Sequence, residues 1–338
     1  MPLPFRVFRG NLYAVGFKPD GDTITFKPND AAAAAALPNT DGNSGTLAVE
    51  ADKNNGVSVR LQGIDALETH YQPMVGENRP AGAATPAVPK PSAGNHEQRR
   101  DLARAAANAL LGMLGVTVTP ADWHSWGYLQ RVRVGTELRT EKFSDNVEVV
   151  VVANTVDSNG RILGWVFPAS VALTEGQLLT EVQLKGLLSK CCNTLLLKEG
   201  WAYPYYFMTV NNGLRSKLTT AVKAAQRDAK GVWAVDQTAA GVAIPDCTTL
   251  HDSAVILPYL FRKLLRAWRM QALATWWAGG DVSPAAMEVL DVGLLFTTGN
   301  PYIYTVSDKQ FLRLSEVVQV EGGMLKLLRQ PQDIVFLE

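Results

Sequence analysis

Two carboxylates stand close together just beyond a segment that reads as a β-strand. Residues 57–61 alternate apolar and polar side chains, the period-2 pattern of a half-buried strand, and Arg60 lies on the polar side. Asp65 and Glu68 follow this strand directly. Because two acids at this spacing repel each other, the sequence predicts a positively charged group between them.

More polar residues stand at turns and strand ends elsewhere in the chain. Asp20 and Asp22 flank the glycine of an Asp-Gly-Asp turn, and Arg161 follows an Asn-Gly pair. Converging carboxylates bind hard divalent cations, and guanidinium groups grip a phosphate through paired hydrogen bonds. A carboxylate that binds no metal can take a proton from water. These residue types are suited to the hydrolysis of phosphodiester bonds.

Spacing alone leaves plainer interpretations open. Asp20 and Asp22 could simply form a hairpin turn. Arg60 could pair with Asp65 in a structural ion pair, and Arg161 could be a solvated turn residue. The residues therefore indicate a catalytic site only if the fold brings them together.

The elements that must position these residues are short strands with a few helices between them. Helices are expected at 96–115 and 181–200, and from about Leu214 to Lys230. Alternating or β-branched runs predict strands at 5–17, 23–26, 57–61, 116–119, 131–134, 146–156 and 160–168. Many short strands with interspersed helices favour an α+β fold built on a small, helix-decorated β-barrel.

Length and composition narrow the class of protein. A chain of 338 residues suggests two domains. Lys+Arg and Asp+Glu balance at 32 each, which argues against a purely electrostatic nucleic-acid coat. The three cysteines show neither a disulfide nor a zinc pattern, so reduced thiols are expected. Neither a signal peptide nor a membrane span is apparent in the sequence, and we expect a cytoplasmic protein without membrane partners.

A change in composition near residue 240 predicts a domain boundary. Residues 234–249 are small, polar and marked by Pro and Gly, so we expect a domain at 1–240 and a C-terminal α+β module at 245–338. In this module 257–280 predict an amphipathic helix whose basic side could follow a nucleic-acid backbone or simply face solvent. A second, capped helix is expected at 283–296. The module could bind a protein partner or mediate self-association.

Six segments stand in a characteristic order along the chain, and the second keeps an Arg-x4-Asp-x2-Glu spacing. They are DGDT (20–23), VRLQGIDALET (59–69), LARAAANALLGML (102–114), DSNGR (157–161), LLLKEGWAY (195–203) and KAAQRDAKGVW (223–233). In this order they resemble the staphylococcal nuclease-like, or thermonuclease, family. The resemblance covers residues 5–235 with insertions and leaves the C-terminal module uncovered.

The resemblance implies an OB-fold-type five-stranded β-barrel decorated by helices, with a metal site at one end. Asp22 and Asp65 match the carboxylate ligands of a catalytic Ca²⁺, and the backbone carbonyl of Ala66 matches a third ligand. Asp20 matches an acid that lies near the metal without binding it. Mg²⁺ or Mn²⁺ could take the place of Ca²⁺.

The resemblance also implies a nuclease that hydrolyses DNA or RNA with little sequence preference. Glu68 matches the general base, and Arg60 and Arg161 match the two arginines that hold the scissile phosphate. Tyr205 or Tyr206 could stack on a base, although core packing explains them equally well. An active cytoplasmic nuclease would need a control, such as the C-terminal module or a partner. The alternative is a scaffold without activity that binds nucleic acid or protein through the same barrel.

The sequence departs from the family pattern at several points. Leu67 stands where the family usually has proline, which could loosen the loop that carries Glu68. Ser158 and Asn159 replace a Lys-Tyr pair that would help to grip a terminal phosphate. Long insertions, expected to reshape the substrate groove, lie at 71–95, 120–146 and 169–190.

Overall fold

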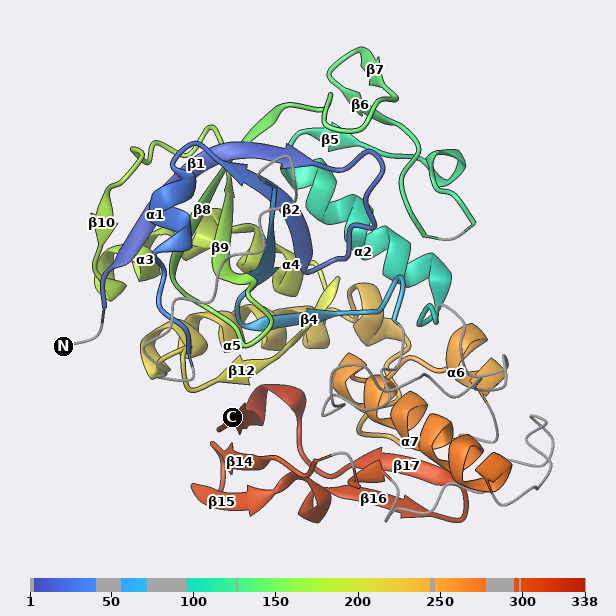
Figure 1. Cartoon of the computed structure of the whole chain (residues 1–338). Helices are drawn as coiled ribbons and strands as arrows, with labels where there is room; N and C mark the ends of the chain where they lie inside the picture. Colours follow the sequence, from blue (N-terminus) through green and yellow to red (C-terminus); the bar gives the residue numbers. More distant parts are fainter. Residues whose placement is uncertain are drawn as a thin grey trace. The chain divides into compact units, whose positions relative to one another are not determined.

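The structure, a computed structural model, describes residues 3–40, 56–71, 96–125, 127–243, 247–277, 295–297 and 299–337 (Figure 1). These residues divide into two compact units. The barrel unit comprises Met1–Ala66 and Arg104–Ala234, and the C-terminal unit comprises Leu67–Ala103 and Val235–Glu338. Residues 67–103 therefore group with the C-terminal unit, although the sequence assigned them to the first domain.

Some expected elements lie outside the described residues. These are most of the helix expected at 283–296 and most of the insertion at 71–95.

Five strands close into a barrel, which confirms the predicted OB-type fold. Their order around the barrel is β1-β2-β3-β9-β8, and β8 pairs back onto β1. All neighbours are antiparallel except β3 and β9, which run parallel. The strands are β1 (Phe5–Tyr13), β2 (Thr23–Pro28), β3 (Val57–Leu61), β8 (Val147–Val156) and β9 (Ile162–Pro168).

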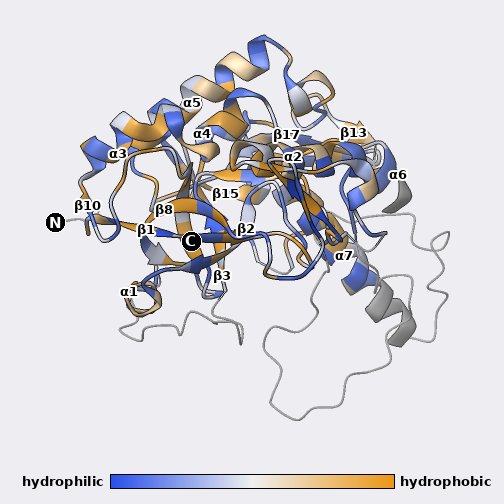
Figure 2. Cartoon of the chain, turned by 90° about the horizontal axis from the view of Figure 1, so that it is seen from above, coloured by the Kyte–Doolittle hydropathy of each residue, from blue (hydrophilic) through white to orange (hydrophobic). Residues whose placement is uncertain are grey.

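The alternation of apolar and polar residues along these strands gives the barrel an apolar inner face. Phe8, Val59 and Val151 lie on the inner face of the sheet and are fully buried, and β8 is hydrophobic along much of its length (Figure 2). Gly164 is required where the walls approach, because a Cβ there would lie 2.7 Å from a methyl group of Val59. A barrel leaves its central strands no open edge for pairing with another chain.

Helices and short sheets surround the barrel. Asp30 and Asn211 cap the N-termini of α1 and α5 with their side chains, as helix-start residues commonly do. The smaller strands are β4 (Ile64–Ala66), β5 (Val116–Thr117), β6 (Val132–Val134), β7 (Glu137–Arg139), β10 (Leu178–Leu179), β11 (Ala202–Pro204) and β12 (Tyr206–Phe207). The helices are α1 (Ala31–Ala35), α2 (Arg100–Met113), α3 (Glu181–Leu187), α4 (Cys192–Lys198) and α5 (Asn212–Arg227).

The helix expected over 181–200 is interrupted. A 3-10 turn at Leu188–Lys190 separates α3 from α4, and Cys191 adopts an extended conformation between them. Cys191 and Cys192 are buried free thiols, as expected for reduced cysteines. Burial raises the pKa of both, that of Cys192 to about 12, so neither ionises at neutral pH.

One buried amide ties α4 to the parallel strands. The Asn193 side chain donates to the carbonyls of Gln62 at 2.9 Å and Gly164 at 3.0 Å, and it accepts from the amide of Val166 at 3.0 Å. Asn193 is fully buried. It therefore adds hydrogen bonds to buried backbone groups where β3 ends beside β9, one of which, the Gly164 carbonyl, also accepts from the amide of Gln62.

Replacing Asn193 by alanine should lower the free energy of unfolding by about 3 kcal/mol, because each buried polar group left unpaired costs ~1–3 kcal/mol. Urea unfolding followed by circular dichroism measures the change. Asn154→Ala is the control, since its amide bonds to Leu3 at an exposed position and should change stability by less than about 0.5 kcal/mol. Equal losses in both variants would contradict this role.

The C-terminal unit is a mixture of helices and strands, as expected for an α+β module. Its long helix buries Phe261, Leu264 and Trp268, the apolar stripe seen in the sequence. No helix among the described residues is both long and apolar enough to cross a membrane. The helices are α6 (Cys247–Asp252) and α7 (Pro258–Trp277). One sheet is β13 (Val242–Ala243), β17 (Met324–Leu327) and β16 (Val318–Glu321), and another contains β18 (Ile334–Phe336), β14 (Tyr302–Thr305) and β15 (Gln310–Arg313).

Two histidines link the segment that begins at His96 to helix α6 of the same unit. His96 Nδ1 and His251 Nε2 lie 2.8 Å apart, and the amide of Arg99 donates to the carbonyl of His251 at 2.8 Å. Burial lowers the pKa of His251, an effect that Asp252 and Glu97 partly offset. The neutral imidazole is therefore the form that the fold favours.

Acidification should destabilise the protein through His251. Because the folded pKa lies below that of the unfolded chain, about 6.5, the unfolded state binds more protons as the pH falls. The contribution of His251 is thus present above pH ~6.5 and is lost as the pH drops toward the folded pKa. Thermal unfolding between pH 7.5 and 5 should show a smaller decline for His251→Gln than for the wild type. Identical declines in the variant and the wild type would refute the assignment.

Candidate active site

The Asp-Gly-Asp turn places Asp22 beside β3 and β4. Thr23 pairs with Arg60 across β2 and β3, and the amide of Leu61 donates to the carbonyl of Asp22 at 2.7 Å. A Cβ on Gly21 would lie 2.6 Å from the Ala66 Cβ and 2.8 Å from that of Ala106. The turn therefore packs directly on β4 and α2, and only glycine allows this approach.

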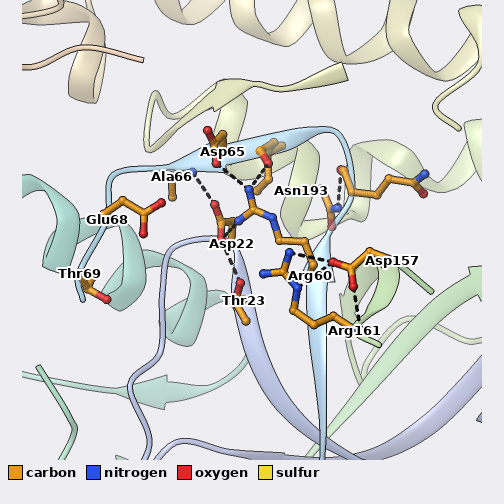
Figure 3. Close-up of polar contacts among 12 residues, drawn as sticks. Asp22, Thr23, Arg60, Asp65, Ala66, Glu68, Thr69, Asp157, Arg161 and Asn193 are labelled. Atoms are coloured by element: carbon orange, nitrogen blue, oxygen red, sulfur yellow. Dashed lines mark hydrogen bonds and ion pairs between the residues drawn. The ribbon is translucent and has the colours of Figure 1, made fainter. Parts of the chain in front are cut away.

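Arg60 lies between two buried carboxylates (Figure 3). Its guanidinium pairs with Asp22, lies 2.6 Å from Asp65 Oδ1, and also contacts the carbonyl of Ile64. The side chains of Asp22, Asp65 and Arg60 are only 3%, 0% and 12% exposed. The sequence predicted one positive group between Asp65 and Glu68, but Arg60 instead lies between Asp22 and Asp65, and Glu68 pairs with Arg262.

Asp22 is held from several sides. Its Oδ2 accepts the amide hydrogen of Ala66 at 2.6 Å, and its Oδ1 accepts from the Thr23 hydroxyl at 3.1 Å. β4 in turn pairs with β11, which sets Asp65 opposite Tyr203. Asp20 closes the turn, with its amide donating to the carbonyl of Thr23 at 3.4 Å. These contacts hold the carboxylate of Asp22 and the backbone that carries Asp65 in fixed positions.

The donor set suits a hard cation. Two carboxylates face one guanidinium, so the three groups retain one formal negative charge. Carboxylate and carbonyl oxygens are the ligands that Ca²⁺ and Mg²⁺ favour. Within the described part of the chain, no three His, Cys, Asp or Glu residues form a metal-binding group, and the expected set contains two carboxylates and a backbone carbonyl. The residues present fit a divalent ion that shares Asp22 and Asp65 with Arg60.

Arg161 is oriented by the turn that precedes β9. Its Nε lies 2.8 Å from Asp157 Oδ2, and the same carboxylate accepts the amide hydrogens of Arg161 at 2.9 Å and Asn159 at 3.0 Å. The Arg161 side chain is 35% exposed, far more than that of Arg60. It is therefore directed by Asp157 and still reaches solvent.

Both arginines belong to the two strands of the parallel pair. Val59 pairs with Ile162 and Arg60 with Leu163, so Arg161 directly precedes the point where β9 meets β3 (Figure 3). The strand register therefore sets Arg161 two positions before the level of Arg60 on the neighbouring strand.

Residues 135–235 match the family model described as staphylococcal nuclease homologue. The match includes β8, β9, α3, α4 and α5, together with Arg161, and it confirms the resemblance inferred from the sequence. No curated protein matches the chain.

The other expected site residues, Glu68, Tyr205 and Tyr206, have different surroundings from the four charged residues. Glu68 belongs to the C-terminal unit, where Arg262 Nη1 lies 2.5 Å from its Oε1. The basic side of α7 is therefore not simply a solvated face. Tyr206 is 1% exposed and its hydroxyl bonds to Thr219, so its ring is not accessible for stacking on a base. Tyr205, which packs edge-on against Phe207, is the remaining aromatic candidate.

Three residues that position the site were not singled out from the sequence. Asp157 had a signal, since it lies four residues before Arg161 in the Asp-x-x-Gly-Arg segment. Asn193 and Arg262 had none, because a single buried amide or a single helical arginine follows no pattern.

Gly21→Ala should lower the free energy of unfolding by about 1–3 kcal/mol, since the added methyl group overlaps Ala66 and Ala106. Denaturant unfolding measures this change. Gly112→Ala is a matched control: this exposed glycine of α2 has open space around its Cβ position, and alanine there should stabilise by up to about 1 kcal/mol. A neutral Gly21→Ala variant would show that the turn does not pack as described.

Proposed function

We propose that this protein is a metal-dependent nuclease that hydrolyses phosphodiester bonds of DNA, RNA or both with little sequence preference. The observation that carries the proposal is the pairing of Arg60 with two buried carboxylates at the barrel end that also bears Arg161. The match to staphylococcal nuclease homologues over residues 135–235 supports the same conclusion.

Arg60 and Arg161 would hold the scissile phosphate. Guanidinium groups bind phosphate oxygens through charge-assisted, often paired, hydrogen bonds. Charge that develops on the phosphate would meet groups already fixed by Asp22, Asp65 and Asp157, so little reorganisation is needed.

Asp22, Asp65 and the carbonyl of Ala66 would hold the metal ion. Ca²⁺, typical of the family, is the favoured candidate, with Mg²⁺ or Mn²⁺ as alternatives. A bound divalent ion supplies Lewis-acid stabilisation of charge on the phosphate oxygens. Asp20, 8% exposed and at the start of the same turn, would add negative charge near the ligands.

Glu68 would act as general base toward the attacking water, and Tyr205 would stack on a base of the substrate. Such stacking tolerates any sequence and suits single strands, whose bases are exposed. Nucleic acid is therefore the expected binding partner, and neither function requires recognition of specific bases.

A scaffold without activity is the second candidate. The ion pairs that join Arg60 to Asp22 and Asp65 would also stabilise a barrel that has no catalytic role. In that case the protein would bind nucleic acid or protein but would not cleave it, with or without divalent ions.

The full-length protein should digest plasmid DNA or RNA in the presence of Ca²⁺, Mg²⁺ or Mn²⁺ and lose this activity with chelator. Glu68→Gln and Arg161→Ala should each lower the rate by ~10²–10⁴, because they remove a proton acceptor and a charge stabiliser. Arg227→Ala is the matched control, since its exposed pair with Asp228 lies on α5. Binding without cleavage by the wild type would favour the scaffold.

A further inference from the structure

The residue proposed as general base is held by the C-terminal unit. Arg262 Nη1 lies 2.5 Å from Glu68 Oε1, and the two side chains are only 20% and 13% exposed. The backbone of Glu68 is fixed as well, because its carbonyl accepts the amide hydrogen of Gln98 at 2.7 Å. Both the main chain and the carboxylate of Glu68 are thus placed by contacts within this unit.

The following residues of the same segment are tied to the same helix. Arg266, one turn after Arg262 on α7, donates from Nε to the Tyr71 hydroxyl at 2.8 Å. Tyr71 also forms a β-bridge with His96. The Gln98 side chain donates to the carbonyl of Ile256 at 2.6 Å. Two arginines on one face of α7 therefore hold the segment that runs from Glu68 to Tyr71.

The helix that supplies these arginines is itself firmly seated. Leu260, Phe261, Leu264 and Leu265 are buried on its apolar side, so Arg262 projects from an element with little freedom to shift. A planar guanidinium that pairs with a carboxylate in a site with little exposure to water fixes the direction of both groups. A general base needs this fixed direction toward the proton that it accepts.

We propose that Arg262 is a positioning residue for the general base. This inference rests on the proposed nuclease function. It gives residues 235–338 a role beyond recruitment alone, because α7 orients the Glu68 carboxylate through its ion pair with Arg262.

Removing Arg262 should change kcat but not KM. Arg262→Gln should lower kcat about 10- to 100-fold and leave KM within about threefold, because substrate binding does not depend on this residue. In a Glu68→Gln background the same change should cost less than about threefold, since Arg262 would act only through Glu68. The double variant removes both charges of the Glu68–Arg262 pair.

The experiment uses full-length protein, a fluorescent single-stranded DNA or RNA oligonucleotide and Ca²⁺. Arg329→Gln is the matched control, because it removes another arginine ion pair of the same unit, with Asp308, and should leave kcat unchanged. Hydrogen exchange without substrate or metal gives an independent measure: amides between Glu68 and Tyr71 should exchange faster in Arg262→Gln than in the wild type or Arg329→Gln.

Several results would overturn the inference. An unchanged or raised kcat in Arg262→Gln would do so, and a raised value would indicate that Arg262 inhibits Glu68. Additive losses in the double variant would show a merely structural role. Should Arg262→Gln fail to fold, Arg262→Lys replaces it, and a kcat equal to that of the wild type would then overturn the inference. A wild type without cleavage would instead refute the proposed function, and this inference with it.

Discussion

The barrel end is organised by the need to balance three charged groups that are almost entirely removed from water. Arg60 on β3 satisfies Asp22 from the preceding turn and Asp65 from β4, and each of these groups would be costly to bury alone. Because each partner comes from a different element, a shift of one residue in any strand register would separate them. The same electrostatic requirement that fixes the local fold therefore collects the acids and arginines suited to a phosphate and its metal ion.

A second constraint acts where β3 and β9 run parallel. Asn193 on α4 adds hydrogen bonds to the buried backbone of Gln62, Gly164 and Val166 at this junction. Arg161 enters β9 at this junction with its direction already set by Asp157. The two arginines thus have different surroundings. Arg60 is buried and pairs with two internal carboxylates, whereas Arg161 pairs with Asp157 and remains accessible to solvent.

Local patterns predicted most of the barrel and much of the candidate site. Alternation identified β3 and β8, and the chain order of short motifs indicated that Asp22, Arg60, Asp65 and Arg161 lie in one region. The split between α3 and α4 was missed because the apolar spacing continues across the turn at 188–190. The partner of Glu68 was missed for a different reason. Arg262 lies far away in sequence, and on a helical projection it resembles any solvated arginine.

The grouping of Leu67–Ala103 with Val235–Glu338 has a consequence for how the protein is made. During synthesis the segment that carries Glu68 is made 194 residues before Arg262. The strands of the barrel all lie between Phe5 and Pro168 and are therefore made before α7. The barrel can thus form while Glu68 still lacks Arg262 as its partner.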